Sequence, residues 1–285
     1  MSIVITGATG KLGHHVVEEL LDRGVPADQV VAAGRALEKV EDLAARGVRT
    51  ARVDLDEPET LTAVLHEGDT LVLVSGTAVQ KRVQQHRDAI AAAARAGVAH
   101  LVYTSAPHAD DTPLVLAPDH AATEQAVRES GVPFTIVRNN WYTENYEQAF
   151  EQAKATGELV ASAGGGRVAS ATRRDYAAAI AAVVTSDGHA GRTYELSGDV
   201  AWSFDDLADA FAEVAGREVA YRRVSADEHV AILTGVGLDE GTARFVAALD
   251  GNIRDGALED ATGDLARLAG RPSTPLVEAV RGFAA

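Results

Sequence analysis

Three glycines near the amino terminus form the pattern with the clearest chemical meaning. They stand in the run Gly7-Ala8-Thr9-Gly10-Lys11-Leu12-Gly13, a GxxGxxG arrangement between a short apolar segment and a helical one. Glycines at this spacing allow a tight turn and let backbone N–H groups at a helix start approach a pyrophosphate. The run therefore predicts a dinucleotide-binding loop, and the alternative is a glycine-rich turn without a ligand.

The nature of the dinucleotide depends on the end of the second predicted strand. An acidic residue beside the adenosine ribose selects NAD, whereas a basic one accepts a 2′-phosphate. The sequence has Gly34-Arg35 at this point, so it predicts NADPH, with Lys11 as a second cation. The alternative for Arg35 is a solvated side chain at a helix start. Further loop residues that we expect along the cofactor, or else in ordinary loop roles, are Asp54, Leu55, Ser75, Gly76 and Thr77.

The elements around this loop follow an alternating pattern. Short β-branched runs alternate with helical segments up to about residue 140, which is typical of βαβ units and a parallel sheet. The predicted strands are 3–6, 30–33, 49–53, 70–75, 100–104 and 134–138, and the predicted helices are 11–23, 36–46, 58–66, 81–96 and 119–130. Glycines at 24, 47, 97 and 131 are expected to end four of these helices. The fold class is therefore α/β, a Rossmann-like doubly wound parallel sheet with its ligand crevice beyond the strand carboxyl ends.

The alternation loosens after Asn140. The remaining chain predicts a turn at 164–166, a buried helix at 176–184, a strand at 193–196, a helix at 203–215 and a mostly helical tail from 225. Ser203 and Asp206 form a capping-box pattern at the start of the 203–215 helix. We expect an NADP-binding domain at 1–140 and a smaller, mostly helical lobe at 141–285 that covers the substrate, with part of its chain returning to the sheet.

The composition limits the partners. The 285 residues include 26 Lys and Arg against 42 Asp and Glu, a formal charge of −16, and the four lysines are scattered. Nucleic-acid binders need clustered cations, so a nucleic-acid partner is excluded. No apolar run is long enough to span a bilayer, and the first residues resemble a strand and not a signal peptide. The absence of cysteine excludes disulfides and thiol catalysis and fits a reducing cytoplasm.

Several ordered motifs carry a resemblance to a known family. After the glycine loop come YTS at 103–105, HAD at 108–110, RNNWYTENY at 138–146, SATR at 170–173, DYA at 175–177 and YELSGD at 194–199. This set resembles the atypical short-chain dehydrogenase/reductases of the NmrA-like group, and most closely the type 2 NAD(P)H:quinone oxidoreductases. The resemblance implies hydride transfer from NADPH to a small quinone without flavin, in an enzyme compatible with a homo-oligomer. It also implies an inner wall for cofactor and substrate made of Asn139, Asn140, Trp141, Tyr142, Thr143, Glu144 and Ser170. Our hypothesis is that Asn140, Trp141 and Tyr142 form the part of this wall that faces the quinone.

The catalytic groups of ordinary short-chain dehydrogenases are missing. Those enzymes use a Tyr with a Lys four residues later, and none of the six tyrosines has this partner. A quinone is already electrophilic, so orientation matters more than a strong acid. Tyr103, Ser105 and His120 are candidates for hydrogen bonding or proton donation, and each has a purely structural alternative. Trp141 likewise either stacks on the substrate or packs in the core.

Two other functions remain open at this stage. One is reduction of triphenylmethane-type dyes, since similar folds with the same glycine loop perform it. The other is a non-catalytic regulator that senses NADP, which the missing Tyr/Lys pair would tolerate. The histidines lack HExxH spacing, so the sequence predicts no metal site, and we assign His14 and His15 to capping and packing.

Overall fold

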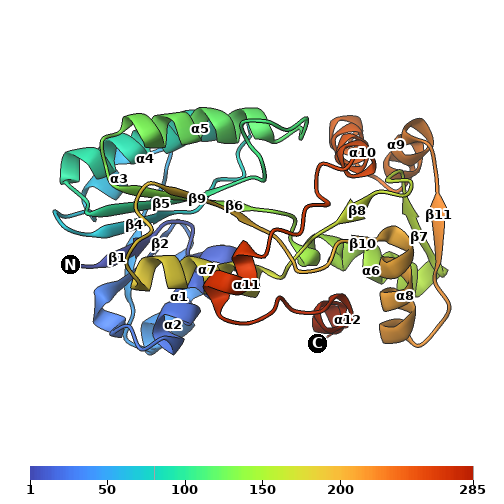
Figure 1. Ribbon diagram of the computed structural model, residues 1–285, viewed down its shortest axis with the longest axis horizontal. Helices are drawn as coiled ribbons and strands as arrows, with labels where there is room; N and C mark the ends of the chain where they lie inside the picture. Colours follow the sequence, from blue (N-terminus) through green and yellow to red (C-terminus); the bar gives the residue numbers. More distant parts are fainter. Residues whose placement is uncertain (80, 285) are drawn as a thin grey trace.

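Seven parallel strands form the central sheet, in the order β3-β2-β1-β4-β5-β6-β9 (Figure 1). The computed structural model describes residues 1–79 and 81–284. The strands are β1 (Ile3–Ile5), β2 (Val30–Gly34), β3 (Arg49–Arg52), β4 (Thr70–Leu73), β5 (His100–Ser105), β6 (Phe134–Asn139) and β9 (Arg192–Leu196). The strand order reverses between β1 and β4, which is where doubly wound sheets bind ligands. The predicted Rossmann-like sheet is confirmed.

Helices cover both faces of the sheet because its strands are apolar on both sides. Along β1, Val4 packs against one layer and Ile5 against the other. One layer contains α3 (Pro58–Thr62), α4 (Arg82–Ala96) and α5 (Ala117–Glu129), and the other contains α1 (Lys11–Asp22), α7 (Arg173–Thr185) and α11 (Asp264–Ala269). Figure 1 shows these two layers above and below the sheet.

The rest of the chain packs at one end of the sheet, around its own apolar core (Figure 1). Phe150, Trp202, Phe204 and Phe211 are the large side chains of this core. The helices here are α6 (Glu147–Thr156), α8 (Phe204–Ala215), α9 (Ala226–Gly235), α10 (Glu240–Arg254) and α12 (Leu276–Arg281). Strand β7 (Glu158–Ala161) pairs with β11 (Ala220–Arg223), and β8 (Arg167–Val168) with β10 (Trp202–Ser203). We call this group of elements the lobe.

The predicted elements agree with the structure most closely in the first half of the chain. The helix predicted at 36–46 is confirmed in part: a 3-10 turn at Leu37–Val40, in which the N–H of Lys39 bonds to the carbonyl of Ala36, precedes a short helix α2 (Glu41–Ala45). The helix predicted at 58–66 ends at Thr62. Further 3-10 turns lie at Ala27–Gln29, Thr143–Tyr146 and Gly282–Ala284.

The second half contains more elements than the sequence predicted. The helical tail and the Ser203–Asp206 capping box are confirmed, and Thr172 and Asp175 form a second capping box at α7. Helix α6 and the strands β7, β8, β10 and β11 were not predicted. Strand β9 pairs with β6, so the chain does return to the sheet after residue 141. The division into domains at residue 140 stays a prediction. No helix in the described part of the chain combines the length and apolarity needed to cross a membrane.

One buried arginine connects two strands, a helix and the loop after β5 at the carboxyl end of the sheet. Arg138, on β6, donates two hydrogen bonds to Glu124 on α5, at 2.8 and 2.7 Å, and a third to Glu195 on β9 at 2.8 Å. Its Nη1 also lies 2.9 Å from a carboxylate oxygen of Asp110. Burial disfavours the guanidinium charge, but these carboxylates raise the pKa of Arg138 above its ordinary value. Ser105, at the end of β5, donates to the same Glu124 at 2.6 Å.

This arrangement predicts unequal roles for two arginines that contact one carboxylate. Replacing Arg138 with Leu leaves Glu124 buried without its main partner and is expected to lower the free energy of unfolding by about 3–5 kcal/mol. Arg128 also contacts Glu124, at 3.2 Å, but its side chain is 42% exposed. Arg128→Leu is the control and should cost about 0–1 kcal/mol. Urea denaturation measures both, and equal losses would contradict the assigned role of Arg138.

Candidate functional site

The glycine turn between β1 and α1 has no space for side chains. Gly7 has a φ of +66°, and a Cβ on Gly13 would lie 2.4 Å from the carbonyl oxygen of Gly7. The N–H of Gly10 bonds to the same oxygen at 2.9 Å. Helix α1 then starts with no side-chain cap and no acidic residue in its first turn. Its first N–H groups and the helix dipole are therefore available to an anion.

A second close approach fixes the turn against β2. The N–H of Ala8 bonds to the carbonyl of Ala33 at 3.0 Å. A Cβ on Gly34 would come within 2.6 Å of the Thr9 side chain, so only glycine fits at this strand end. Gly34 is a site residue that sequence reasoning missed, and its position directly before Arg35 was the available signal. The side chain of Arg35 is exposed and makes no ion pair with the described residues.

Lys11, in the glycine turn, forms an ion pair with the lobe. Its Nζ lies 3.0 Å from a carboxylate oxygen of Glu147, at the start of α6, and both side chains are exposed. This ion pair links the glycine turn to the lobe. Exposed pairs of this kind contribute little to stability, so the lysine can exchange its partner at small cost.

Buried side chains fix the loops after β3 and β4. The N–H of Ser75 bonds to the hydroxyl of Thr104 at 2.8 Å, and the N–H of Gly76 bonds to Nε2 of His86 at 3.0 Å. Thr77 is exposed. After β3, the N–H of Asp54 bonds to Thr60 at 2.9 Å, while Leu55 packs against the layer that contains α4.

His86 is a second residue that the sequence reasoning did not assign to the site. It is fully buried, and its Nδ1 lies 3.0 Å from the hydroxyl of Thr123. Burial, together with the neighbouring Arg82, lowers the pKa of His86 to about 4. The imidazole is therefore neutral at pH 7 and accepts the Gly76 N–H, which holds the loop after β4 in place.

The three catalytic candidates lie between β5 and α5. Tyr103 is fully buried, and its hydroxyl lies 2.9 Å from Nδ1 of His120. Burial, with Arg82 and His86 nearby, lowers the pKa of His120 to about 3. The imidazole is therefore neutral at pH 7 and does not act as a cationic proton donor. Burial also raises the pKa of Tyr103. The hydroxyl of Ser105 is engaged by Glu124. These contacts favour the structural alternative for all three, and their catalytic roles stay untested predictions.

The predicted inner wall forms a continuous segment after β6. Thr143 and Ser170 hydroxyls lie 2.7 Å apart, and Trp202 Nε1 donates to Ser170 at 3.0 Å. The backbone N–H of half-buried Trp141 bonds to the side chain of Asn140 at 2.6 Å. The structure thus brings Ser170 to the 139–144 segment, as the resemblance implied, but nothing tests whether these residues contact a cofactor.

An aromatic pair supports the middle of this wall. The ring of Tyr142 packs edge-on against Tyr176 of α7, with centroids 5.3 Å apart. The guanidinium of Arg173 lies 4.9 Å above the Tyr142 ring. Glu144 accepts the backbone N–H of Arg173 at 2.8 Å, at the start of α7. The wall is therefore held by α7, the helix that also packs against α1.

Unpaired polar atoms gather in this same region. Among the described residues, four buried side-chain atoms make no hydrogen bond: Asn139 Oδ1, Glu144 Oε2, Tyr146 Oη and Arg173 Nη1. All four come from the end of β6, the 3-10 turn that follows it and the first residue of α7. Leaving a polar group buried and unpaired costs about 1–3 kcal/mol. Arg173 Nη1 and Glu144 Oε2 lie 3.6 Å apart and form an ion pair with each other. Asn139 Oδ1 and Tyr146 Oη are therefore the two described buried atoms left without a partner, and they indicate a place where a ligand can supply one. Sequence reasoning did not assign Tyr146 or Arg173 to the site, although both lie within the recognised motifs.

Comparison with known proteins shows the family to which the chain belongs. A parallel sheet with a glycine turn at a helix start defines a dinucleotide-binding α/β protein. A model of the NmrA-like family matches residues 1–250. The chain is 43% identical to Quinone oxidoreductase 2 of Escherichia coli strain K12 over 278 residues, which cover 98% of this chain and 97% of that protein. This chain belongs to the NmrA-like family, which confirms the resemblance found in the sequence.

Two solved structures are similar over the whole chain. The crystal structure of the NADPH-dependent quinone oxidoreductase QOR2 from E. coli, in complex with NADPH, matches with a TM-score of 0.94 and 42% identity, covering 99% of this chain and 100% of that one. The triphenylmethane reductase of a Citrobacter species matches with a TM-score of 0.93 and 36% identity, covering 99% of both chains.

The unpaired hydroxyl of Tyr146 can be compared with a paired one. The Tyr176 hydroxyl is also buried but donates to the carbonyl of Trp141 at 3.2 Å. Tyr176→Phe is expected to lower the free energy of unfolding by about 1 kcal/mol, whereas Tyr146→Phe should leave it unchanged or raise it. Chemical denaturation of the ligand-free protein measures both. An equal loss in the two variants would show that Tyr146 is paired inside the protein.

The lowered pKa of His86 predicts a dependence of stability on pH. Below pH 6.5 the unfolded chain binds a proton at this histidine, while the folded protein does not until about pH 4. This group should thus lower the free energy of unfolding by about 3 kcal/mol as the pH falls from 6.5 to 4. His86→Gln removes this loss, so its free energy of unfolding should approach that of the wild type as the pH falls. His66→Gln, at an exposed position, is the control and should keep the wild-type pH dependence. Parallel curves for wild type and His86→Gln would refute the assignment.

Proposed function

We propose that this chain is an NADPH-dependent quinone oxidoreductase that transfers a hydride directly to a quinone, without flavin. The observation that carries the proposal is the near-complete match, at 43% identity, to Quinone oxidoreductase 2 of E. coli. The steric requirement for glycine at Gly7 and Gly13 and the unpaired polar atoms after β6 give the proposal a physical basis in this chain.

The residues present fit NADPH. The glycine turn and the uncapped start of α1 would hold the pyrophosphate, and exposed Arg35 would meet the 2′-phosphate. Asn139 offers an unpaired acceptor at the other end of the site, and Arg173 a guanidinium that is ion-paired with Glu144 at 3.6 Å. When bound, NADPH supplies the hydride that reduces the quinone. The wall residues Asn140, Trp141 and Tyr142 are proposed to orient the acceptor and exclude water from it.

Orientation is the main contribution that these residues make to the reaction. Holding two reactants in contact distance replaces a bimolecular encounter and can lower the barrier by several kcal/mol, about 7–11 in well-oriented systems. A lowered pKa keeps His120 neutral, and Tyr103 lies under α5, so neither suits a proton donor. We propose that water protonates the reduced quinone. We further propose a cytoplasmic enzyme that acts on a small quinone and is compatible with a homo-oligomer.

Dye reduction is the second candidate, because triphenylmethane reductase matches with nearly the same TM-score. A steady-state assay separates the candidates by following nicotinamide absorbance. NADPH should be consumed with 1,4-benzoquinone more efficiently, in kcat/KM, than with malachite green. A reversed preference would favour the dye. If the protein binds NADPH but no acceptor leads to its oxidation, the enzyme proposal is wrong and a regulator that senses NADP is favoured.

Cofactor choice gives a separate prediction. Arg35→Ala should weaken NADPH binding by about 10- to 100-fold, because a charged hydrogen bond to phosphate contributes about 1.5–3 kcal/mol, and should leave NADH binding unchanged. Arg95→Ala, on the exposed side of α4, is the charge-matched control and should change neither. Fluorescence titration of the two nucleotides measures the affinities. Equal effects on NADPH and NADH would refute the role of Arg35.

A further inference from the structure

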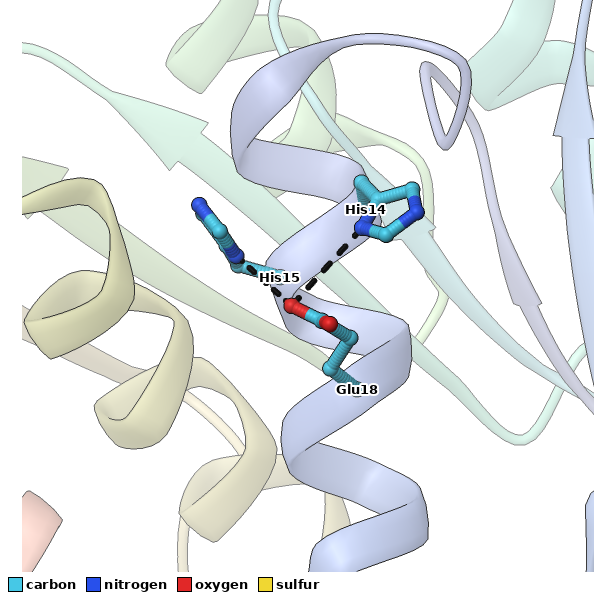
Figure 2. A group of neighbouring side chains, drawn as sticks. All are labelled: His14, His15 and Glu18. Atoms are coloured by element: carbon cyan, nitrogen blue, oxygen red, sulfur yellow. Dashed lines mark hydrogen bonds and ion pairs between the residues drawn. The ribbon is translucent and has the colours of Figure 1, made fainter. Parts of the chain in front are cut away.

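Two histidines and a glutamate of α1 form a cluster outside the nucleotide site. His14, His15 and Glu18 project from neighbouring positions of the helix, and Figure 2 shows both imidazoles turned toward the Glu18 carboxylate. One donor atom from each residue lies within 4.8 Å of the others. All three side chains are partly exposed, at 24%, 33% and 25%, so solvent reaches the cluster.

The spacing of these atoms fits a small metal ion. Glu18 Oε2 lies 2.8 Å from His15 Nδ1 and 3.7 Å from His14 Nδ1. Ligands at about 2.0–2.1 Å from a tetrahedral ion are separated by about 3.3 Å, between these two values. Two imidazoles and one carboxylate are also ligands that Zn²⁺ and its neighbours accept, and the fourth position would belong to water.

A second carboxylate orients one of the ligands. His14 Nε2 lies 2.9 Å from Asp42 Oδ2, a residue of α2. When Nε2 donates its proton to Asp42, the lone pair of Nδ1 points toward Glu18 and is free to bind an ion. Carboxylate support of the distal imidazole nitrogen is typical of metal sites, where it fixes the tautomer and raises ligand basicity.

The surrounding charges also favour a cation. Arg174 is the cation near Glu18, but its guanidinium lies 3.3 Å from Glu19 and 3.5 Å from Asp22 and is thus neutralised by other carboxylates. The chain as a whole carries a formal charge of −16. No group of this kind is found elsewhere in the described residues.

We propose that His14, His15 and Glu18 bind one divalent transition-metal ion of the zinc class, with Asp42 as the supporting carboxylate. The sequence predicted no metal site because it lacks HExxH spacing. Here the ligands are instead consecutive and one turn apart on a single helix, and Asp42 comes from another element. The proposal is independent of the quinone activity.

Isothermal titration of the tag-free protein with ZnCl₂ tests the site. We expect one ion per chain in the wild type, and loss of this binding in the His14→Ala/His15→Ala variant. Asp42→Asn should weaken binding by about 10- to 100-fold, as removal of a supporting carboxylate does. His66→Ala, which removes an exposed histidine elsewhere, is the control and should bind like the wild type.

A spectroscopic experiment with Co²⁺ reports on the coordination geometry of the bound ion. Co²⁺ bound at the same site should give visible d–d absorption that ZnCl₂ abolishes by displacement, and circular dichroism should show that the variants are folded. The proposal is overturned if the wild type binds no Zn²⁺ in one-to-one ratio. It is also overturned if the folded double-alanine variant binds with unchanged affinity, since the ion would then sit elsewhere.

Discussion

The close approach of Gly13 to the carbonyl of Gly7 is the constraint on which the architecture depends. A single Cβ at Gly13 would lie 2.4 Å from that oxygen, so the start of α1 can approach the end of β1 only while position 13 is glycine, and the φ of +66° favours glycine at position 7. This approach places α1 against α7, and α7 in turn supports the wall after β6 with Tyr176 and Arg173. The glycine turn and the wall after β6 are thus positioned through one pair of packed helices.

Local signals account for what the sequence could predict. The glycine turn, the parallel strands and the capping box at Ser203 depend on neighbouring residues, so their patterns are visible in the chain. The segment predicted as one helix at 36–46 begins as a 3-10 turn, because a helix of so few turns gains little from its own hydrogen bonds and its form is decided by how Val40 and Leu43 pack in the core. The small paired strands of the lobe were missed because two to four residues carry no periodicity and are defined by partners distant in sequence.

The catalytic candidates show a different limit of prediction from the sequence. Tyr103 and Ser105 are two residues apart on β5, so they share one face of the sheet, and His120 and Glu124 are four apart on α5. These periodicities imply that the four side chains meet, which they do. They do not reveal that the meeting place is the interior between strand and helix. The unpaired atoms of Asn139 and Tyr146 have no sequence signature either, because lack of a partner is a property of the folded surroundings.

The return of the chain to the sheet through α7, β9 and α11 has a consequence for modularity. The chain passes between the sheet and the lobe several times. The sheet and its helical layers therefore contain elements from both sides of residue 140. A cut at residue 140 would remove β9 from the edge of the sheet and α7 from the face that also carries α1. The residues after 140 therefore cannot be exchanged as one contiguous segment without also replacing α7, β9 and α11 of the sheet and its helical layer.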